Sequence, residues 1–162
     1  MRNISFAIAI GLFWSLAGLA QSPAKFSPDD NRSGINPPPY SMPNTAEQQQ
    51  VEQNLKDVRF DFDRYDVKPE DQPILQQAAN WLKANPSVYV AIAGNADERG
   101  EIVYNLALSD KRAKVTRDAL IGMGVPDSQI VFATGWGELY PTCTESGENC
   151  WSQNRRAHFE MW

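Results

Sequence analysis

Apolar residues recur at helical spacing in two segments of the chain, residues 68–86 and 103–123. The first repeat is carried by Ile74, Leu75, Ala78, Ala79 and Leu82, and the second by Leu106, Leu108, Val115, Ala119, Leu120 and Met123. Spacings of three and four residues place such side chains on one face of a helix. The pattern therefore predicts two amphipathic helices, and Gly124 is expected to end the second one.

Four other segments show the patterns of strands. They are VRFDF (58–62), VYVAIAG (88–94), QIVFATGWG (129–137) and RRAHFEMW (155–162). The first alternates apolar and polar residues, as a half-buried strand does, and the second is nearly all apolar, which indicates burial on both faces. The order β-α-β-α-β-β predicts an α+β fold, a two-layer sandwich with two helices packed on a mixed four-stranded sheet.

The N-terminal part of the chain lacks these patterns. Residues 1–20 combine Arg2, an apolar run and the small-x-small sequence Gly18-Leu19-Ala20, which is typical of a secretory signal peptide. An uncleaved membrane anchor is the alternative interpretation. Residues 21–56 are predicted to form a Pro-rich, disordered tether that ends in a short polar helix. The folded domain is predicted to span residues 57–162.

Charge and cysteine content narrow the possible partners. The 162-residue chain has a formal net charge of −5, which argues against a nucleic-acid partner. Its two cysteines, Cys143 and Cys150, cannot form a structural zinc site alone. In an exported chain they are predicted to form a disulfide. A free redox-active pair is the alternative, but the spacing is not Cys-x-x-Cys. No metal or cofactor is expected.

The segment GNADERG (94–100) follows the predicted all-apolar strand, at the edge where open α/β sheets tend to bind ligands. Asp97 lies in this segment, and Arg112 lies in the following helix, two turns beyond Asn105 on roughly the same face. A carboxylate and a guanidinium on one pocket would be complementary to a zwitterion. On spacing alone, the commoner arrangement is that Asp97 forms a turn and Arg112 is solvated.

Three segments, FDFDRYDVKPE, GNADERGEIVYNLALSDKRAKVTRDALIGMGV and NRRAHFEMW, strongly resemble the OmpA-like C-terminal domain in sequence and order. Within that family, the likeness is to the peptidoglycan-associated lipoproteins of the Gram-negative outer membrane, over residues 57–162. The resemblance implies a non-enzymatic protein of the periplasm and outer membrane that binds the peptide stem of peptidoglycan and ties the envelope to the wall. It also allows a periplasmic partner of the Tol system.

The resemblance further implies which residues bind the stem peptide. Asp97 would take the ammonium of meso-diaminopimelate and Arg112 its carboxylate, while Gly100 permits the turn into the helix. Additional contacts are implied for Asp63, Tyr104, Asn105 and Arg156. Replacing Asp97 or Arg112 by alanine is then expected to remove binding and to leave folding largely intact.

The chain departs from the lipoproteins in two places. Leu19 stands where the lipobox cysteine would be, so a lipid anchor is not implied. The segment CTESGENC (143–150) resembles a disulfide-pinned version of the loop before the last strand, and it is expected only to add rigidity.

A peptidoglycan-cleaving glycosidase is the competing enzyme hypothesis. It would pair Asp61 and Asp63 with Asp97 or Glu98. One carboxyl group would need a raised pKa, whereas Arg-rich surroundings favour ionised carboxylates. His158 is the single histidine, without a nucleophile constellation around it.

Three tryptophans, Trp136, Trp151 and Trp162, lie in or beside the last two predicted strands. Aromatic rings of this kind can stack on sugars. The preferred interpretation is that they seal the edges of a small core.

Overall fold

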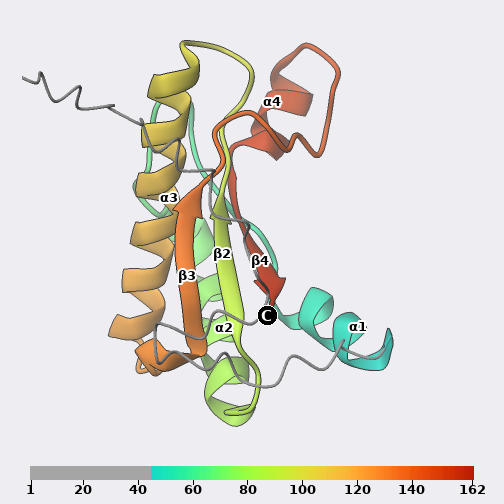
Figure 1. Ribbon diagram of the computed structural model, residues 1–162, viewed down its shortest axis with the longest axis vertical. Coiled ribbons are helices and arrows are strands. Elements are labelled where there is room, and N and C mark those ends of the chain that lie inside the picture. The colour runs from blue at the N-terminus through green and yellow to red at the C-terminus, as the bar shows by residue number, and fades with distance from the viewer. Residues whose placement is uncertain (1–44) are drawn as a thin grey trace, which may run out of the picture. The chain divides into compact units, whose positions relative to one another are not determined.

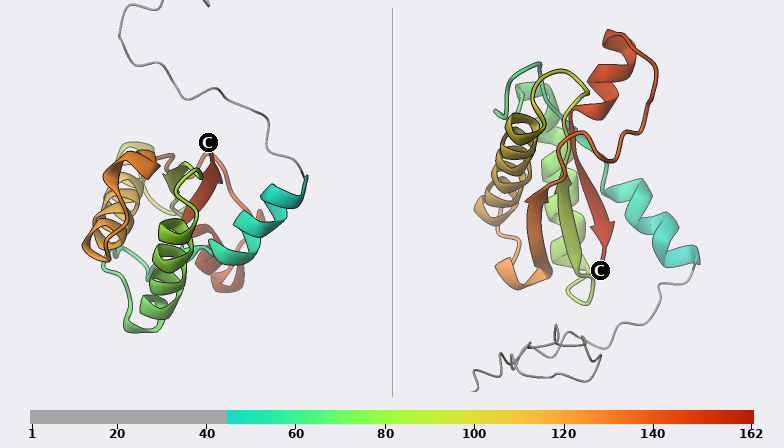
Figure 2. Two further views of the ribbon diagram at one scale, coloured as in Figure 1. Left: turned by 90° about the horizontal axis from the view of Figure 1, so that it is seen from below. Right: turned by 45° about the horizontal axis from the view of Figure 1, so that its top comes forward.

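The computed structural model describes residues 45–162 and contains one mixed four-stranded sheet with two long helices on one side (Figures 1 and 2). The elements in chain order are α1 (Thr45–Asn54), β1 (Val58–Arg59), α2 (Gln72–Ala84), β2 (Val90–Gly94), α3 (Ile102–Gly122), β3 (Ile130–Gly135), α4 (Glu148–Asn154) and β4 (Arg156–Met161). The predicted α+β fold is confirmed. The predicted signal peptide and most of the tether lie outside the described residues.

The strands are ordered β1-β4-β2-β3 across the sheet. Strand β2 pairs in parallel with β3, whereas β4 pairs antiparallel with both β2 and β1. Side chains of β4 alternate between the two faces. Ala157 and Phe159 belong to the core beneath the helices, so the alternate side chains of Arg156, His158 and Glu160 face the opposite, open side of the sheet.

Helix α3 packs directly on the ends of two strands because both strands end in glycine. A Cβ atom on Gly94 would lie 1.8 Å from the carbonyl oxygen of Ser109, and one on Gly135 would lie 2.4 Å from the Ser109 hydroxyl oxygen. Any larger residue would push the helix away. This close approach fixes the middle of α3, including Arg112 one turn later, at the carboxyl edge of the sheet.

The core joins the predicted faces of both helices to the sheet. It includes Leu75, Leu82, Val90, Ile92, Leu120 and Phe159. Val51 and Leu55 also belong to this core, so packing begins before residue 57. Among residues 45–162, no helix is long and apolar enough to cross a membrane.

Two segments differ from their predicted structure. The strand predicted over residues 58–62 is paired only at Val58–Arg59, because the chain then turns. In that turn the amide of Arg64 donates to the carbonyl of Asp61 at 3.2 Å, and Asp63 has a positive φ of 57°. The second difference is α4, which forms in the segment predicted to be a disulfide-pinned loop.

Candidate functional site

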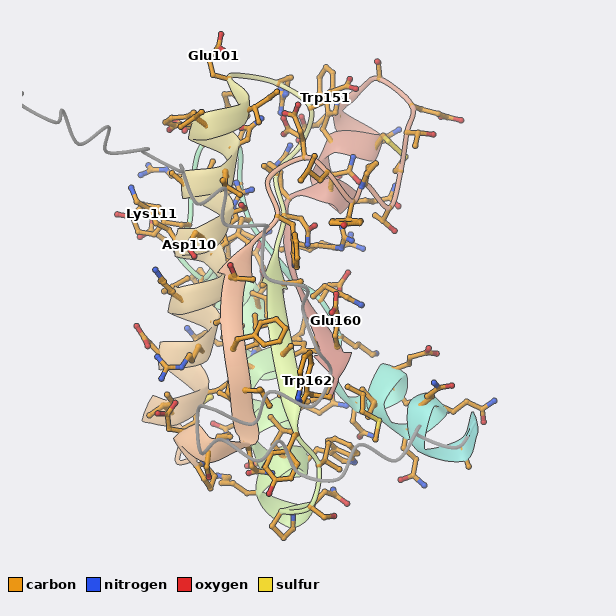
Figure 3. All side chains as sticks on the ribbon, viewed as in Figure 1. Glu101, Asp110, Lys111, Trp151, Glu160 and Trp162 are labelled. Atoms are coloured by element: carbon orange, nitrogen blue, oxygen red, sulfur yellow. A yellow bond between two sulfur atoms is a disulfide. The ribbon has the colours of Figure 1, made fainter. Side chains whose placement is uncertain are left out.

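A pocket of about 230 Å³ lies beside the carboxyl end of β2. This end of the molecule is at the top of Figure 3, where Glu101 and Trp151 are labelled. Five predicted site residues line the pocket: Asp63, Asp97, Tyr104, Asn105 and Arg112. The loops after β1 and β2 and the first three turns of α3 therefore meet at one pocket.

Arg112 is 1% exposed and is held by three backbone carbonyl groups. Its Nε donates to the carbonyl of Arg64 at 2.8 Å, its Nη1 to that of Asn95 at 2.8 Å, and its Nη2 to that of Asp61 at 3.1 Å. A guanidinium has five N–H donors, so two remain for a ligand. Burial, together with the nearby charge of Arg155, lowers the pKa of Arg112 to about 10, which keeps it charged at neutral pH.

Asp97 is 3% exposed and accepts four hydrogen bonds from two arginines. Its Oδ1 accepts from the backbone amide and the Nε of Arg99, both at 3.1 Å. Its Oδ2 accepts from Nη2 of Arg99 at 2.8 Å and from Nη1 of Arg155 at 3.1 Å. Burial alone would raise the pKa of Asp97, but these bonds outweigh it and place the pKa below its ordinary value.

These four bonds occupy the acceptor positions of the Asp97 carboxylate. A further donor could therefore bind Asp97 only in place of one already present. The Arg99 side chain is 32% exposed, whereas that of Arg155 is 6% exposed. Arg99 is thus the donor that a ligand can displace.

Arg99 also lies between two aromatic rings. Its guanidinium carbon is 4.1 Å from the ring centre of Phe62 and 4.0 Å from that of Trp151, distances typical of cation–π contacts. Trp151 belongs to α4, and its indole N–H donates to Oε1 of Glu98 at 3.0 Å. Helix α4 therefore supports the loop that carries Asp97.

Tyr104, Asp63 and Asn105 fix the rim of the pocket. The Tyr104 hydroxyl donates to Oδ1 of Asp63, which ties the turn after β1 to the start of α3. The left-handed backbone of Asp63 is strained for a residue other than glycine, and such strain is common at functional sites. Nδ2 of Asn105 lies within hydrogen-bond distance of the carbonyls of Asp97 (3.2 Å) and Arg99 (3.1 Å). Asn105 thereby holds the loop in place.

The structure does not bring Arg156 into this pocket. Its Nη2 donates to the carbonyl of Tyr140 at 3.3 Å, and its Nε lies 3.3 Å from Oδ2 of Asp57, on the open side of the sheet. Its predicted place as a supporting contact is taken by Arg155, which lines the pocket. The period-2 alternation of β4 carries this signal, because Arg155 shares the parity of the apolar Ala157.

The predicted disulfide between Cys143 and Cys150 is confirmed, and α4 begins inside the segment it closes. The expected role of rigidity alone is incomplete. Besides Trp151, α4 contributes Glu148, whose Oε1 accepts from Nη2 of Arg155 at 2.5 Å. The disulfide thus anchors a helix that contacts both arginines of Asp97.

Replacing both cysteines by serine is expected to lower the free energy of unfolding by about 2–3 kcal/mol, since the disulfide closes a short loop in the unfolded chain. Urea denaturation of the double variant beside the oxidised protein measures this loss. Ser146→Ala, in the same loop, removes one exposed hydrogen bond to Glu98 and is the control, expected within about 0.5 kcal/mol. An unchanged stability of the double variant would contradict this account of the disulfide.

Comparison with known proteins agrees with this fold. Residues 59–155 match the model of the OmpA family. The chain is 36% identical over 151 residues to the peptidoglycan-associated lipoprotein of Brucella melitensis, covering 93% of this chain and 88% of that protein. The corresponding lipoprotein of Haemophilus influenzae is 38% identical over 107 residues, covering 66% of this chain and 69% of that protein.

Solved structures give the same assignment. The crystal structure of the peptidoglycan-associated lipoprotein from Burkholderia pseudomallei has a TM-score of 0.63 and 44% identity, covering 66% of this chain and 90% of that one. The C-terminal domain of Helicobacter pylori MotB shares the fold at 16% identity, with a TM-score of 0.61 over 66% of this chain and 84% of its own. The chain therefore belongs to the OmpA family and is similar to its peptidoglycan-associated lipoproteins.

Proposed function

We propose that this protein binds peptidoglycan non-covalently, through the diaminopimelate of the stem peptide, and so links the cell envelope to the wall. The names of its relatives, which are peptidoglycan-associated lipoproteins, support this choice of polymer. The observation that carries the proposal is one small pocket lined by a buried guanidinium, Arg112, and a buried carboxylate, Asp97. Those two charges match the ends of an amino-acid head group.

In the proposed complex, the carboxylate of diaminopimelate accepts from the two remaining donors of Arg112. Its ammonium donates to Asp97 in place of Arg99. Each charge-assisted contact contributes about 1.5–3 kcal/mol, so the ammonium and carboxylate contacts together give a dissociation constant between about several millimolar and tens of micromolar for one domain. Many copies along the wall would raise the overall strength of attachment.

A location in the periplasm, in association with the outer membrane, follows from the same proposal. The alternative is a protein-interaction module of a Tol-type envelope complex. A glycosidase is disfavoured, because the pKa of Asp97 is lowered, whereas a catalytic acid needs a raised one.

Co-sedimentation of the purified protein with sacculi that contain meso-diaminopimelate tests the proposal. Free meso-diaminopimelate is expected to release the bound protein. 1,5-Diaminopentane is the matched control, because it keeps both amines on the same five-carbon chain but lacks both carboxylates, and it is expected to release much less. If the protein does not sediment with sacculi, the Tol-type partner becomes the preferred function. Release of soluble sugar fragments would instead support the glycosidase.

A further inference from the structure

A second pocket, of about 240 Å³, opens on the face of the sheet that the helices leave uncovered. It is lined by residues of three segments: Asn95 after β2, Trp136 and Tyr140 after β3, and Arg156, His158 and Glu160 of β4. Glu160 and Trp162 are labelled on this face in Figure 3. Asn95 also contacts a residue of the pocket around Arg112, because its backbone carbonyl accepts from Arg112.

Two walls of the second pocket are aromatic. The rings of Trp136 and Tyr140 meet edge to face, with centres 5.3 Å apart and planes at 88°. Two rings at right angles form a corner, and Tyr140 is 60% exposed. The electron-rich faces of such rings attract polarised C–H groups, including those on the flat faces of sugar rings.

Two other walls carry polar atoms without a hydrogen-bond partner among residues 45–162. They are Nη1 of Arg156, a donor, and Oδ1 of Asn95, an acceptor. Both residues are more than nine-tenths buried. Their orientations are fixed, since Nδ2 of Asn95 donates to the carbonyl of Ala93 at 3.0 Å and Nη2 of Arg156 donates to that of Tyr140. Buried polar atoms normally have partners, so a further partner is expected for this donor and this acceptor beside the pocket.

The charges around the second pocket are balanced, unlike those expected of an anion site. Asp57 lies 3.3 Å from Nε of Arg156 and 2.7 Å from Nδ1 of His158. Glu160 is a carboxylate of the lining itself. The pocket therefore offers donors and acceptors side by side. Hydroxyl and acetamido groups, which both donate and accept, fit such a lining better than a phosphate or a carboxylate does.

We propose that this pocket binds one sugar residue of a glycan strand, with the ring against Trp136 and Tyr140 and its polar groups on Arg156 and Asn95. The choice of polymer rests on the proposed function, because peptidoglycan carries acetylated amino sugars beside its stem peptides. Asn95 connects the two pockets, because its carbonyl accepts a hydrogen bond from Arg112 and the residue lines the sugar pocket. One protein would then hold the wall by its peptide and by its sugar.

The test is a titration of the purified protein with glycan strands from which an amidase has removed the stem peptides. Trp136→Ala is expected to weaken this binding about tenfold, by analogy with the loss of an aromatic ring that stacks on a nucleobase. Trp162→Ala is the matched control. It removes a tryptophan of the same face that packs on Phe132, 4.9 Å away, and does not line the pocket, so affinity should stay within about twofold.

Tyr140→Ala removes an exposed side chain and should weaken glycan binding similarly, which keeps the test valid if Trp136→Ala fails to fold. Unchanged glycan affinity in folded Trp136→Ala or Tyr140→Ala, or equal loss in Trp162→Ala, would overturn the inference. A separate titration with meso-diaminopimelate distinguishes the two proposals. If the protein binds diaminopimelate but not the stripped glycan, the sugar pocket is wrong and the proposed function stands. The reverse result would remove the diaminopimelate site and retain the sugar pocket.

Discussion

Replacing Arg112 by alanine is expected to abolish binding to sacculi and also to lower the free energy of unfolding by about 2–4 kcal/mol. The side chain is buried and bonds the carbonyls of Asp61, Arg64 and Asn95. Truncation leaves those carbonyls without their charged donor. Urea denaturation and co-sedimentation measure the two effects. The sequence-based expectation of an intact fold is therefore revised, because this arginine joins three segments as well as facing the pocket.

Lys114→Ala serves as the control for Arg112→Ala. It removes a cation from the same helix, but Lys114 is exposed and pairs with Asp110, four residues earlier. The expected change in stability is below about 0.5 kcal/mol. Arg112→Lys keeps the charge, but a single ammonium cannot reproduce the planar fork, so it should recover little binding. Wild-type stability of Arg112→Ala would contradict the role assigned to the three carbonyl bonds.

Replacing Asp97 by asparagine is expected to lower the free energy of unfolding by about 3 kcal/mol at neutral pH and to remove binding to sacculi. The substitution keeps the shape of the side chain but leaves the buried guanidinium of Arg155 without the Asp97 charge. Removing one partner of a buried ion pair has a cost of this order. Urea denaturation and co-sedimentation again provide the measurements.

The effect of Asp97→Asn should depend on pH in a defined direction. The pKa of Asp97 in the folded protein lies below its ordinary value of 3.8. Its stabilising contribution is therefore present above pH 3.8 and is lost as the pH falls through the folded pKa. The stability difference from wild type should be similar at pH 7 and 5.5 and should shrink in strongly acidic solution.

Glu98→Gln is the matched control for Asp97→Asn. Glu98 is the neighbouring carboxylate, but it is exposed, and its partners are the neutral Ser146 hydroxyl and Trp151 indole. A glutamine oxygen can still accept both bonds, so stability should change by less than about 0.5 kcal/mol at any pH. An equal loss in this variant would show that the effect of Asp97→Asn reflects general charge in the loop rather than its two arginines.

Hydrophobic periodicity predicted the elements that build the core. The apolar stripe of α2 and the all-apolar run of β2 are long and regular, so each has one preferred structure. The strand predicted over residues 58–62 shows that apolar alternation does not indicate where a strand ends. Alternation continues through Phe62, but hydrogen bonding in the turn at Asp61 ends the pairing. Such a tertiary arrangement leaves no mark on the apolar pattern.

Helix α4 could not be predicted in the same way. Its sequence, ENCWSQN, is polar and is shorter than two helical turns. It therefore has no apolar stripe to detect. It is stabilised by contacts made elsewhere: the disulfide to Cys143, the hydrogen bonds of Asn154 to residues 142 and 143, and the pairing of Glu148 with Arg155. These depend on the folded domain.

The sequence predicted which charged residues lie near one another, but not which of them pair. Asp97 and Arg112 do line one pocket, yet Arg99 was treated only as part of the loop, although it occupies the carboxylate. No local pattern separates an arginine that folds back on Asp97 from a solvated one. Choosing between Arg155 and Arg156 was possible in principle, because strand parity places only the former on the side of Phe159.

The position of β4 in the sheet has a consequence for how the domain is made. This strand follows all the others in sequence, but it lies between β1 and β2 and pairs with both. Until residues 156–161 have been synthesised, β1 has no strand to pair with, and the β2–β3 pair lacks its antiparallel neighbour. The domain therefore completes its sheet only at the end of its biogenesis, through contacts distant in sequence, which are slow to form. A chain truncated before β4 would lose a central strand, so β1 would be separated from the β2–β3 pair.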